Sequence, residues 1–346
     1  MQFIRPDINL DFIGKRKIAF IFSLVMILIS IGTLIMHGGP RYGIDFAGGT
    51  LIQVQFDKPV EIAQIKDGLR NMDFSQASVQ QFGEEGATEY LIRTDVPDMT
   101  DKGFNATLRQ TLTDTTGAAV EIRRVEMVGP QVGQDLREKA LKAMFYALLF
   151  ITVYISGRFE LKWLLSAVLA VALIGAVYVF GLFNVSIPFL ILMALLVTLT
   201  LFWFLNLRYA MGAIVALIHD VMITVGVFSL FDKEFTLPII AALLTIIGYS
   251  LNDTIIVFDR IRENSKKLHK NPLAYVINRS INETLSRTLL TSLTTLVVVV
   301  TLFILGGGII HDFAFALLVG VLIGTYSSVF VASPILLAWQ RKSSAG

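Results

Sequence analysis

The stretch LPIIAALLTIIGYSLNDTIIVF, residues 237–258, decides what kind of protein this sequence encodes. Only one of its residues, Asp253, is charged. About 20 mostly apolar residues in a helix that rises about 1.5 Å per residue are enough to cross the hydrocarbon core of a bilayer. The stretch therefore predicts a transmembrane helix that carries a carboxylate inside the membrane.

Similar apolar stretches recur along the chain, and with residues 237–258 they predict about eight spans. The stretch nearest the N-terminus, residues 18–36, follows basic residues as in a signal peptide. It is too long for a signal peptide and no Ala-x-Ala cleavage site follows it, so we expect a retained anchor. The seven other stretches are residues 18–36, 139–156, 163–183, 187–205, 209–231, 288–305 and 313–336.

The composition agrees with a membrane protein and excludes several classes. Of the 346 residues, 54% are hydrophobic and 16% are charged, and the mean hydropathy is +0.68. A soluble domain carries about 25% charged residues, so an ordinary cytosolic enzyme and a disordered chain are excluded. The net charge of +2 gives no electrostatic footprint for nucleic acid.

The residues that commonly bind metals or nucleotides are scarce. The chain has no cysteine, which excludes disulfides, thiolate metal sites and a cysteine nucleophile. Its four histidines lack the spacing of metal ligands, and no glycine-rich loop ends in Gly-Lys-Ser/Thr. We therefore expect no metal and no cofactor.

Residues 37–135 are the large polar region of the sequence, and their pattern predicts a domain outside the membrane. Alternating and helical spacing of apolar residues gives the order βαββαβ, which is typical of a ferredoxin-like domain. The fold class we expect is a polytopic α-helical membrane protein with an extracytoplasmic α+β ferredoxin-like domain. The predicted strands are residues 50–56, 78–82, 89–94 and 119–125, and the helices are 60–72 and 100–115.

The distribution of basic residues predicts the orientation. Cytoplasmic loops carry an excess of Lys and Arg, so we expect both termini in the cytoplasm and the soluble domain outside, in the periplasm where there is an outer membrane. Within residues 260–287, helical spacing favours an amphipathic helix at the membrane surface, and a plain basic loop is the alternative. The basic side chains are at positions 158, 162 and 208, in region 260–287, and at 341 and 342, whereas loops 184–186, 232–236 and 306–312 carry one lysine.

Asp253 is the first candidate functional residue. A charge inside a bilayer costs at least about 2.5 kcal/mol and usually faces a partner or a water path. Removal from water disfavours the charged form of a carboxylate, and a nearby arginine favours it, so Asp253 could exchange a proton near neutral pH. Ser250, Asn252 and Thr254 are its hydrogen-bonding neighbours in sequence, and a structural carboxylate capped by them is the alternative.

Three other ionisable residues are expected inside or near the membrane. Arg287 begins the predicted span 288–305 in the same leaflet as Asp253, so it is the natural partner, although an interfacial arginine that contacts lipid phosphate is equally consistent. His219 and Asp220 lie near the middle of their predicted span. Their position is consistent either with a proton relay to Asp253 or with a hydrogen bond between two packed helices.

Two further sites are expected at the membrane surfaces. Asp259 and Arg260 lie at the cytoplasmic interface, where we expect them to neutralise each other or to anchor the helix end. At the opposite surface, glycines 48 and 49 follow Asp45 and Phe46. Gly48 and Gly49 permit a sharp turn into the next strand. A second hypothesis is that they form a pivot on which the outer domain moves.

Five motifs, in order along nearly the whole chain, resemble the SecD/SecF family of translocase subunits, in its SecF branch. They are GIDFAGGT (43–50), VGPQVG (128–133), ALIHD (216–220), YSLNDTIIVFDRIRE (249–263) and SRT (286–288).

This resemblance implies a small relative of the resistance–nodulation–division transporters in the bacterial inner membrane. Family members pair with SecD, associate with the SecYEG channel and YajC, and use the proton-motive force to draw a translocating polypeptide out on the far side. They are not enzymes, and membrane lipid surrounds them. The family's proton path maps to Asp253 and Arg287, and we assign Asn252, Asp220 and His219 to the same path.

The resemblance also implies a division of the chain. A typical member has six spans, so residues 161–206 are expected to be an inserted membrane hairpin. The expected division is a cytoplasmic N-terminus (1–17), first anchor (18–36), periplasmic domain (37–135), second family span (136–160), hairpin (161–206), third and fourth spans (207–259), cytoplasmic loop (260–287), fifth and sixth spans (288–338) and cytoplasmic tail (339–346).

Two alternative functions remain open on the sequence alone. One is an exporter of small molecules or lipids built on the same architecture. The other is an intramembrane aspartyl protease that uses Asp220 and Asp253, although the sequence has no recognised protease motif.

Overall fold

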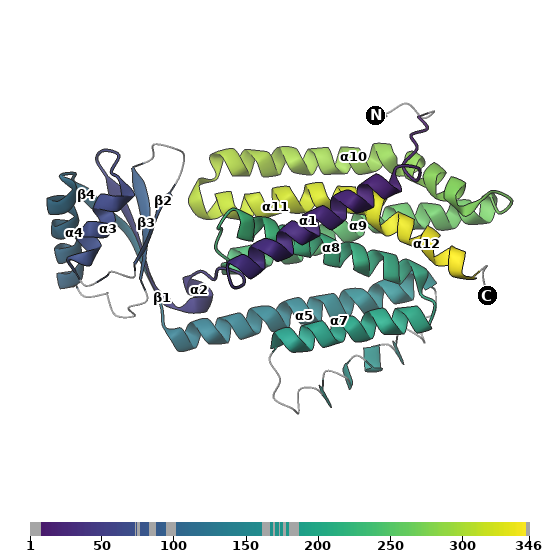
Figure 1. Ribbon diagram of the computed structural model, residues 1–346, viewed down its shortest axis with the longest axis horizontal. Helices are drawn as coiled ribbons and strands as arrows, with labels where there is room; N and C mark the ends of the chain where they lie inside the picture. The colour runs from purple at the N-terminus through teal and green to yellow at the C-terminus, as the bar shows by residue number, and fades with distance from the viewer. Residues whose placement is uncertain are drawn as a thin grey trace.

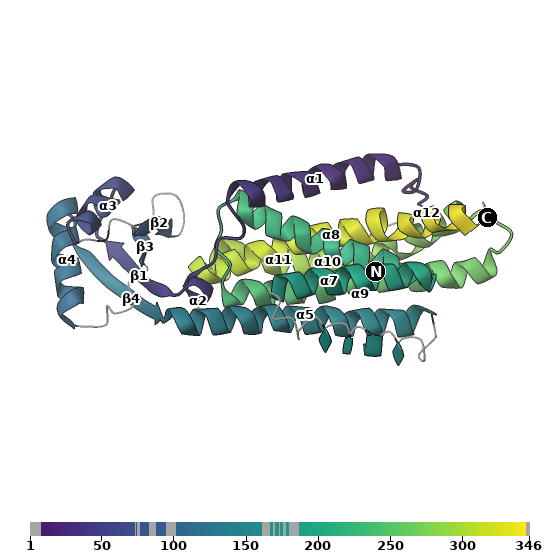
Figure 2. The same cartoon turned by 60° about the horizontal axis from the view of Figure 1, so that its bottom comes forward.

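The computed structural model describes residues 8–72, 74, 77–82, 88–94, 102–160, 167–168, 170–172, 174–175, 178–179 and 187–343. The molecule is elongated, with a small α+β domain at one end of a long helical bundle (Figures 1 and 2). Both ends of the described chain lie at the end of the bundle that is remote from this domain (Figure 1).

Within the described residues, six helical segments are long and apolar enough to cross a membrane, so the chain is a multi-pass membrane protein. The sixth segment is continuous through three elements, with a π-helix at its centre. The segments are α1 (Arg16–Met36), α5 (Pro130–Glu160), α8 (Arg208–Leu230), α9 (Leu237–Lys267), α10 (Leu273–Leu305), and α11 (Gly307–Ser327) with η1 (Ser328–Ala332) and α12 (Ser333–Ser343).

A shorter apolar helix, α7 (Ile187–Phe204), packs against α5 and α8. It covers the region where the sequence predicts the second half of an inserted hairpin. The first half, predicted at residues 163–183, lies largely outside the described residues.

The region 260–287 differs from both interpretations of the sequence. Residues up to Lys267 continue α9 and residues from Leu273 onward belong to α10, so the region is a helical hairpin rather than a separate surface helix or a plain loop. α9 ends at Lys267 and Pro272 immediately precedes α10, and because proline disfavours helix at the residue before it, the two helices stay separate. At about 1.5 Å per residue, α10 is about 50 Å long, whereas the hydrocarbon core is about 30 Å thick. α10 is therefore longer than a membrane span requires.

The α+β domain has the predicted order of strands and helices. Its four strands form an antiparallel sheet in the order β2-β3-β1-β4. Alternate residues of β1, namely Ile52, Val54 and Phe56, are buried against α3 and α4, as the period of a strand requires. The elements are β1 (Gly49–Phe56), α3 (Ile62–Arg70), β2 (Ser78–Phe82), β3 (Glu89–Thr94), α4 (Lys102–Thr116) and β4 (Val120–Val128).

The junction between domain and bundle is a tight turn. The short helix α2 (Ile44–Ala47) ends at Gly48 and Gly49, whose φ angles of 78° and 108° are in the region that favours glycine. A Cβ atom on Gly48 would lie 2.9 Å from Cα of Pro130, the first residue of α5. The predicted turn is therefore present, and a pivot at this point would have to separate the turn from α5.

Candidate functional site

The α9 helix places Asp253 in the interior of the bundle. Its exposed fraction is 1%, because one face of α9 repeats at helical spacing against its neighbours. The groups that act on the carboxylate are the Ser292 hydroxyl and the positive charge of Arg287, both on α10. The Oδ2 atom of Asp253 has no hydrogen-bond partner among the described residues.

A buried carboxylate oxygen without a donor is costly, because its loss of hydration is not repaid. On the facing α10 helix, the buried Thr288 hydroxyl also has no partner within the described part of the chain. Ser292 is bound from two sides, by the Tyr249 hydroxyl at 3.2 Å and by Thr325 at 2.7 Å. Near Asp253, the Ser292 hydroxyl is therefore held by two hydrogen bonds, whereas Asp253 Oδ2 and the Thr288 hydroxyl have no partner among the described residues.

Two predicted members of the site lie at the edge of the bundle. Arg287 is exposed and lies inside α10, fourteen residues after Leu273, rather than at a helix start. It forms no salt bridge within the described residues and acts on Asp253 through space. Asn252 is also exposed, on the opposite side of α9 from its buried neighbours Asp253 and Thr254.

Asp220 forms a second, fully buried centre on α8. Its Oδ1 atom lies 2.8 Å from His219 Nδ1, and its Oδ2 atom accepts hydrogen bonds from Ser250 at 2.5 Å and Ser327 at 2.7 Å. The predicted pair, His219 and Asp220, is therefore hydrogen-bonded to α9 through Ser250 and to α11 through Ser327. These donors satisfy the carboxylate that burial would otherwise make costly.

The network continues from His219 to α1. His219 Nε2 lies 3.0 Å from the Ser23 hydroxyl, which lies 3.0 Å from the Tyr326 hydroxyl. The Tyr326 hydroxyl in turn donates to the backbone oxygen of Ala19 at 2.7 Å. Sequence reasoning missed Ser23, Ser327 and Tyr326. The signal that could have found them is a hydroxyl inside an otherwise apolar helix.

The two carboxylates are connected through α9. Ser250, which donates to Asp220, lies one helical turn before Asp253 on the same buried face. An aspartyl protease requires two carboxylates that share a proton. Asp220 is bound by a histidine and two serines instead, which gives no support to the protease interpretation.

Close packing holds α9 against α11 at this level. Gly320 and Gly324 form a G-x-x-x-G pattern, which permits close approach of membrane helices. A Cβ atom on Gly324 would lie 3.0 Å from Cβ of Ser250, and one on Gly320 would lie 2.3 Å from Ile246. The π-helix that follows at Ser328 adds an irregular turn, a feature frequent at functional sites.

Asp259 and Arg260 pair with other residues rather than with each other, so of the two roles expected for them, mutual neutralisation is absent. Asp259 forms a salt bridge of 2.8 Å with Arg158 of α5. Arg260 binds Glu263 at 2.6 Å and Glu283 of α10 at 2.8 Å. Adjacent residues of a helix point in different directions, which explains the separate partners.

At the other end of α9, the Asp45 side chain caps the helix from a distant part of the chain. Its Oδ2 atom accepts a 2.8 Å hydrogen bond from the backbone N–H of Leu237, whereas the side chain of Thr236, at the N-cap position, makes no capping bond. Alongside it, the backbone N–H of Gly43 donates to Phe235, and the backbone N–H of Phe235 donates to Arg41. Phe46 is buried beside this contact.

The sheet domain contacts the same loop. Arg93 of β3 binds Glu234 at 3.2 Å and the backbone oxygen of Tyr42 at 2.6 Å. Arg41 also pairs with Asp232 and lies 3.6 Å from Glu234. Within the described residues, no group of three His, Cys, Asp or Glu side chains could hold a metal ion.

The fold and the site together indicate the class of protein. Buried carboxylates within a helical bundle, joined at one end to an α+β domain, are features of a multi-pass membrane transporter rather than of a soluble enzyme.

Comparisons with known proteins agree with that class. The family model described as "Protein export membrane protein SecD/SecF, C-terminal" matches residues 107–200 and 174–342, and the "SecD/SecF GG Motif" matches residues 33–60. The chain is 45% identical over 341 residues to protein translocase subunit SecF of Magnetococcus marinus, covering 97% of this chain and 94% of that protein. It is 41% identical over 337 residues to SecF of Vibrio alginolyticus, covering 97% and 91%.

A solved structure is also similar. The crystal structure of SecDF, a translocon-associated membrane protein, from Thermus thermophilus matches 98% of this chain with a TM-score of 0.76 and 32% identity. The match spans 40% of the length of that SecDF chain. This chain belongs to the SecF family of protein translocase subunits.

Proposed function

We propose that this translocase subunit uses the proton-motive force to promote late steps of polypeptide export, with Asp253 as the proton carrier. The observation that carries the proposal is the buried Asp253 carboxylate, whose Oδ2 atom has no donor among the described residues. As a rule, burial disfavours the charged form of a carboxylate and a nearby positive charge favours it, and Asp253 is buried with Arg287 on the neighbouring helix α10. Opposed influences of this kind suit a group that gains and loses a proton.

His219 and Asp220 complete the proposed proton path. Asp220 contacts α9 through Ser250, one turn from Asp253, and His219 reaches α1 through Ser23. A change of charge at Asp253 would alter the packing around Ser250. The hydrogen-bonded network therefore offers a route by which protonation on α9 shifts α8 and α11.

The N-terminal end of α9 provides the proposed link to the outer domain. Asp45 caps this end, and Arg93 of the sheet binds Glu234 in the loop just before it. Movement of α9 would pull on both contacts. We propose that this route transmits the proton step to the outer domain, which we assign to the ferredoxin-like class from its strand order β2-β3-β1-β4.

The proposed location is the bacterial inner membrane, with both termini in the cytoplasm and the α+β domain in the periplasm. The basic hairpin between α9 and α10 and both described chain ends lie at the end of the bundle remote from the domain (Figure 1). Positive residues favour the cytoplasmic side. The proposed eight-span count adds α7 and residues 163–183 to the six long segments, as an inserted hairpin.

The proposed partner is SecD, with the SecYEG channel, YajC and the translocating polypeptide as further contacts. Support comes from the SecDF structure, in which a chain of greater length contains the matched region. On this chain, α9 also exposes a face of small and polar residues, which suits close contact with another membrane helix. The face comprises Ala241, Thr245, Gly248 and Asn252.

The test is the isosteric substitution Asp253→Asn, which removes the titrating group. Export of a secreted precursor should lose its stimulation by a proton gradient and fall to the rate measured without the gradient. Asp114→Asn, the same change on the exposed face of α4, should retain the stimulation. Gradient-stimulated export by an Asp253→Asn variant that is folded and still associated with its partners would refute Asp253 as the carrier.

A further inference from the structure

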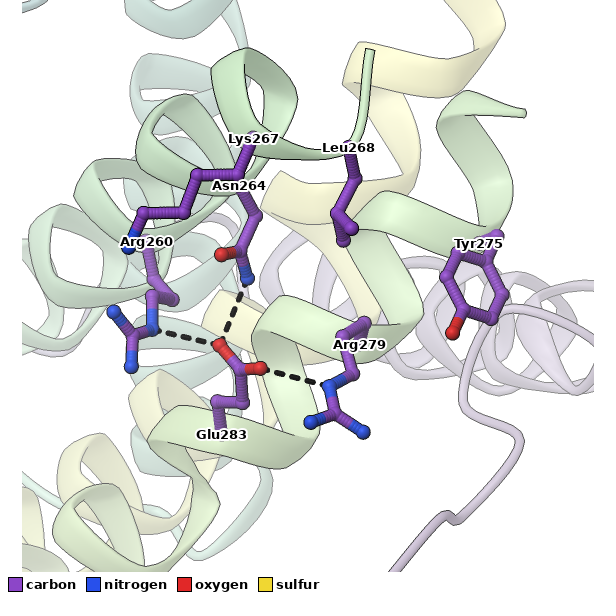
Figure 3. A pocket seen from close by; sticks show the side chains of 7 residues that line it. All are labelled: Arg260, Asn264, Lys267, Leu268, Tyr275, Arg279 and Glu283. Carbon is purple, nitrogen blue, oxygen red and sulfur yellow. Dashed lines mark hydrogen bonds and ion pairs between the residues drawn. The ribbon is translucent and has the colours of Figure 1, made fainter. Parts of the chain in front are cut away.

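A polar pocket lies at the end of the bundle remote from the sheet domain, outside the proposed proton path. It has a volume of about 420 Å³ and lies between the end of α9 and the start of α10 (Figure 3). The side chains that matter for its chemistry are Arg260, Asn264, Lys267, Tyr275, Arg279 and Glu283.

Glu283 positions two arginines in this pocket. It forms a salt bridge with Nε of Arg260 at 2.8 Å and accepts hydrogen bonds from Nε of Arg279 at 2.7 Å and the amide of Asn264 at 2.8 Å. In the described part of the chain, neither terminal nitrogen of Arg279 has a partner. Figure 3 shows both of them turned away from Glu283. The carboxylate thus fixes the guanidinium and leaves its paired N–H groups available.

The charge around the pocket is positive. Arg260, Lys267 and Arg279 line it together with Glu283. Glu263 pairs with Arg260 and Lys267, so these five side chains leave one positive charge in excess. Residues 260–287 as a whole contain seven Lys or Arg residues and two Glu residues. A fixed guanidinium fork in such a field matches the geometry and charge of a phosphate group.

The position of the pocket indicates which phosphate it meets. Arg260 follows almost directly on the apolar stretch 237–258, so the pocket begins where the hydrocarbon region ends. Tyr275, at 49% exposure, is an aromatic residue of the kind found at membrane interfaces. Basic pockets between helices at this level bind lipid headgroups.

We propose that this pocket binds the phosphate group of an anionic phospholipid, with the terminal nitrogens of Arg279 as its main donors. The lipid then holds the α9–α10 hairpin against the membrane surface. The proposal does not depend on the proton path, so it is tested without any export measurement.

The experiment is native mass spectrometry of the full chain in neutral detergent with added phosphatidylglycerol, phosphatidylethanolamine or inorganic phosphate. We expect phosphatidylglycerol to bind about tenfold more tightly than phosphatidylethanolamine, and Arg279→Gln to weaken its binding about tenfold, as expected for loss of a bidentate phosphate contact. Arg279→Lys keeps the charge but loses the fork, so it should give an intermediate value. Arg262→Gln, which removes the same charge outside the pocket, should change binding less than about twofold.

The outcomes separate the possible sources of the phosphate. Competition between inorganic phosphate and phosphatidylglycerol, abolished in Arg279→Gln, would support a phosphate site that a lipid occupies. Equal weakening by Arg279→Gln and Arg262→Gln would overturn the proposal, because general charge would then explain the binding. Binding of inorganic phosphate without phosphatidylglycerol would overturn the lipid assignment. Unchanged thermal midpoints and elution volumes would show that the variants remain folded.

Discussion

At the scale of single residues, the two buried aspartates have different surroundings. Asp220 is held by His219 and two serine hydroxyls, so every oxygen has a partner. Asp253, three residues beyond Ser250, has an oxygen with none among the described residues. In the proposed path, Asp253 is therefore the carboxylate that takes up the proton, and Asp220 is the carboxylate that joins α8 to α9 and α11 through Ser250 and Ser327.

We expect Ser250→Ala to destabilise the bundle. The change removes one of two hydroxyl donors to Oδ2 of Asp220, and loss of a hydrogen bond to a buried charged group costs about 1–3 kcal/mol. Thermal unfolding of the purified chain in detergent measures the effect. Thr245→Ala removes a hydroxyl from the exposed face of the same helix and is the matched control. Equal shifts for the two variants would contradict the role assigned to the Asp220 network.

The sequence was sufficient to single out His219, Asp220 and Asp253, because ionisable residues are rare in membrane spans, and the structure buries all three inside the bundle. It placed Arg287 near a helix start, but the residue lies well inside α10. A hydroxyl inside an apolar helix marks Ser23 and Tyr326 as candidates, but sequence alone could not show that they join the His219 network. Their role depends on how α1 and α11 pack around His219, which the pattern within a single helix does not encode.

At the scale of elements, α9 connects the parts of the proposed mechanism. Its first residue is bound by Asp45, its middle carries Ser250 and Asp253, and its last turns form the basic hairpin. Each part of the helix contacts a different neighbour. A shift of α9 would therefore change contacts at both ends of the bundle.

We expect Asp45→Ala to loosen the first turn of α9. Loss of an N-terminal cap costs about 0.5–2 kcal/mol, so amide hydrogen exchange at Leu237, Ile239 and Ile240 should become faster. Asp45→Asn keeps an acceptor oxygen and should stay close to the wild-type rate. Exchange that is unchanged in Asp45→Ala would show that the 2.8 Å contact does not stabilise the helix.

We expect Gly320→Ala to separate α11 from α9. The added methyl group would lie 2.3 Å from Ile246, which is fully buried, and overpacking of this kind costs about 1–3 kcal/mol. Thermal unfolding in detergent is the measurement. Gly248→Ala on α9, where no atom lies within 4 Å of the new methyl, should leave the isolated chain as stable or slightly more stable. If Gly320→Ala and Gly248→Ala had the same thermal midpoint, α11 would not pack closely against α9 at Gly320.

The elements of the outer domain were predictable because alternation in a strand identifies its buried face. β2 and β3 match the predicted residues, and β1 differs by one residue. The ends of the long helices were not predictable from hydropathy. An apolar stretch marks where the membrane ends, whereas α9 continues to Lys267 and α10 begins directly after Pro272.

At the scale of the whole molecule, the α+β domain and the bundle are joined by several contacts rather than by a single linker. The Gly48 turn lies against α5, Arg93 binds the loop before α9, and Asp45 caps α9. This arrangement favours a domain that moves together with the membrane helices. It explains how an event at Asp253 could reach the far end of the molecule.

The chain has no cysteine, so single cysteines can report its orientation without background. We expect a membrane-impermeant maleimide to label Asp114→Cys, in the outer domain, from the periplasmic side. Lys270→Cys, in the α9–α10 hairpin, should react only after the membrane is opened. Both positions are exposed, so a difference in labelling reflects sidedness. The reverse pattern would contradict the orientation predicted from the basic loops.

The central claim is that the Asp253 carboxyl group gains and loses a proton inside the bundle. Infrared difference spectroscopy of the chain, reconstituted with its membrane partner, measures this directly as the pH is changed across neutrality. We expect a carboxylic acid band that appears as the pH falls, persists in Asp114→Asn and is missing in Asp253→Asn. A spectrum in which Asp253→Asn leaves the titrating band unchanged would contradict the claim.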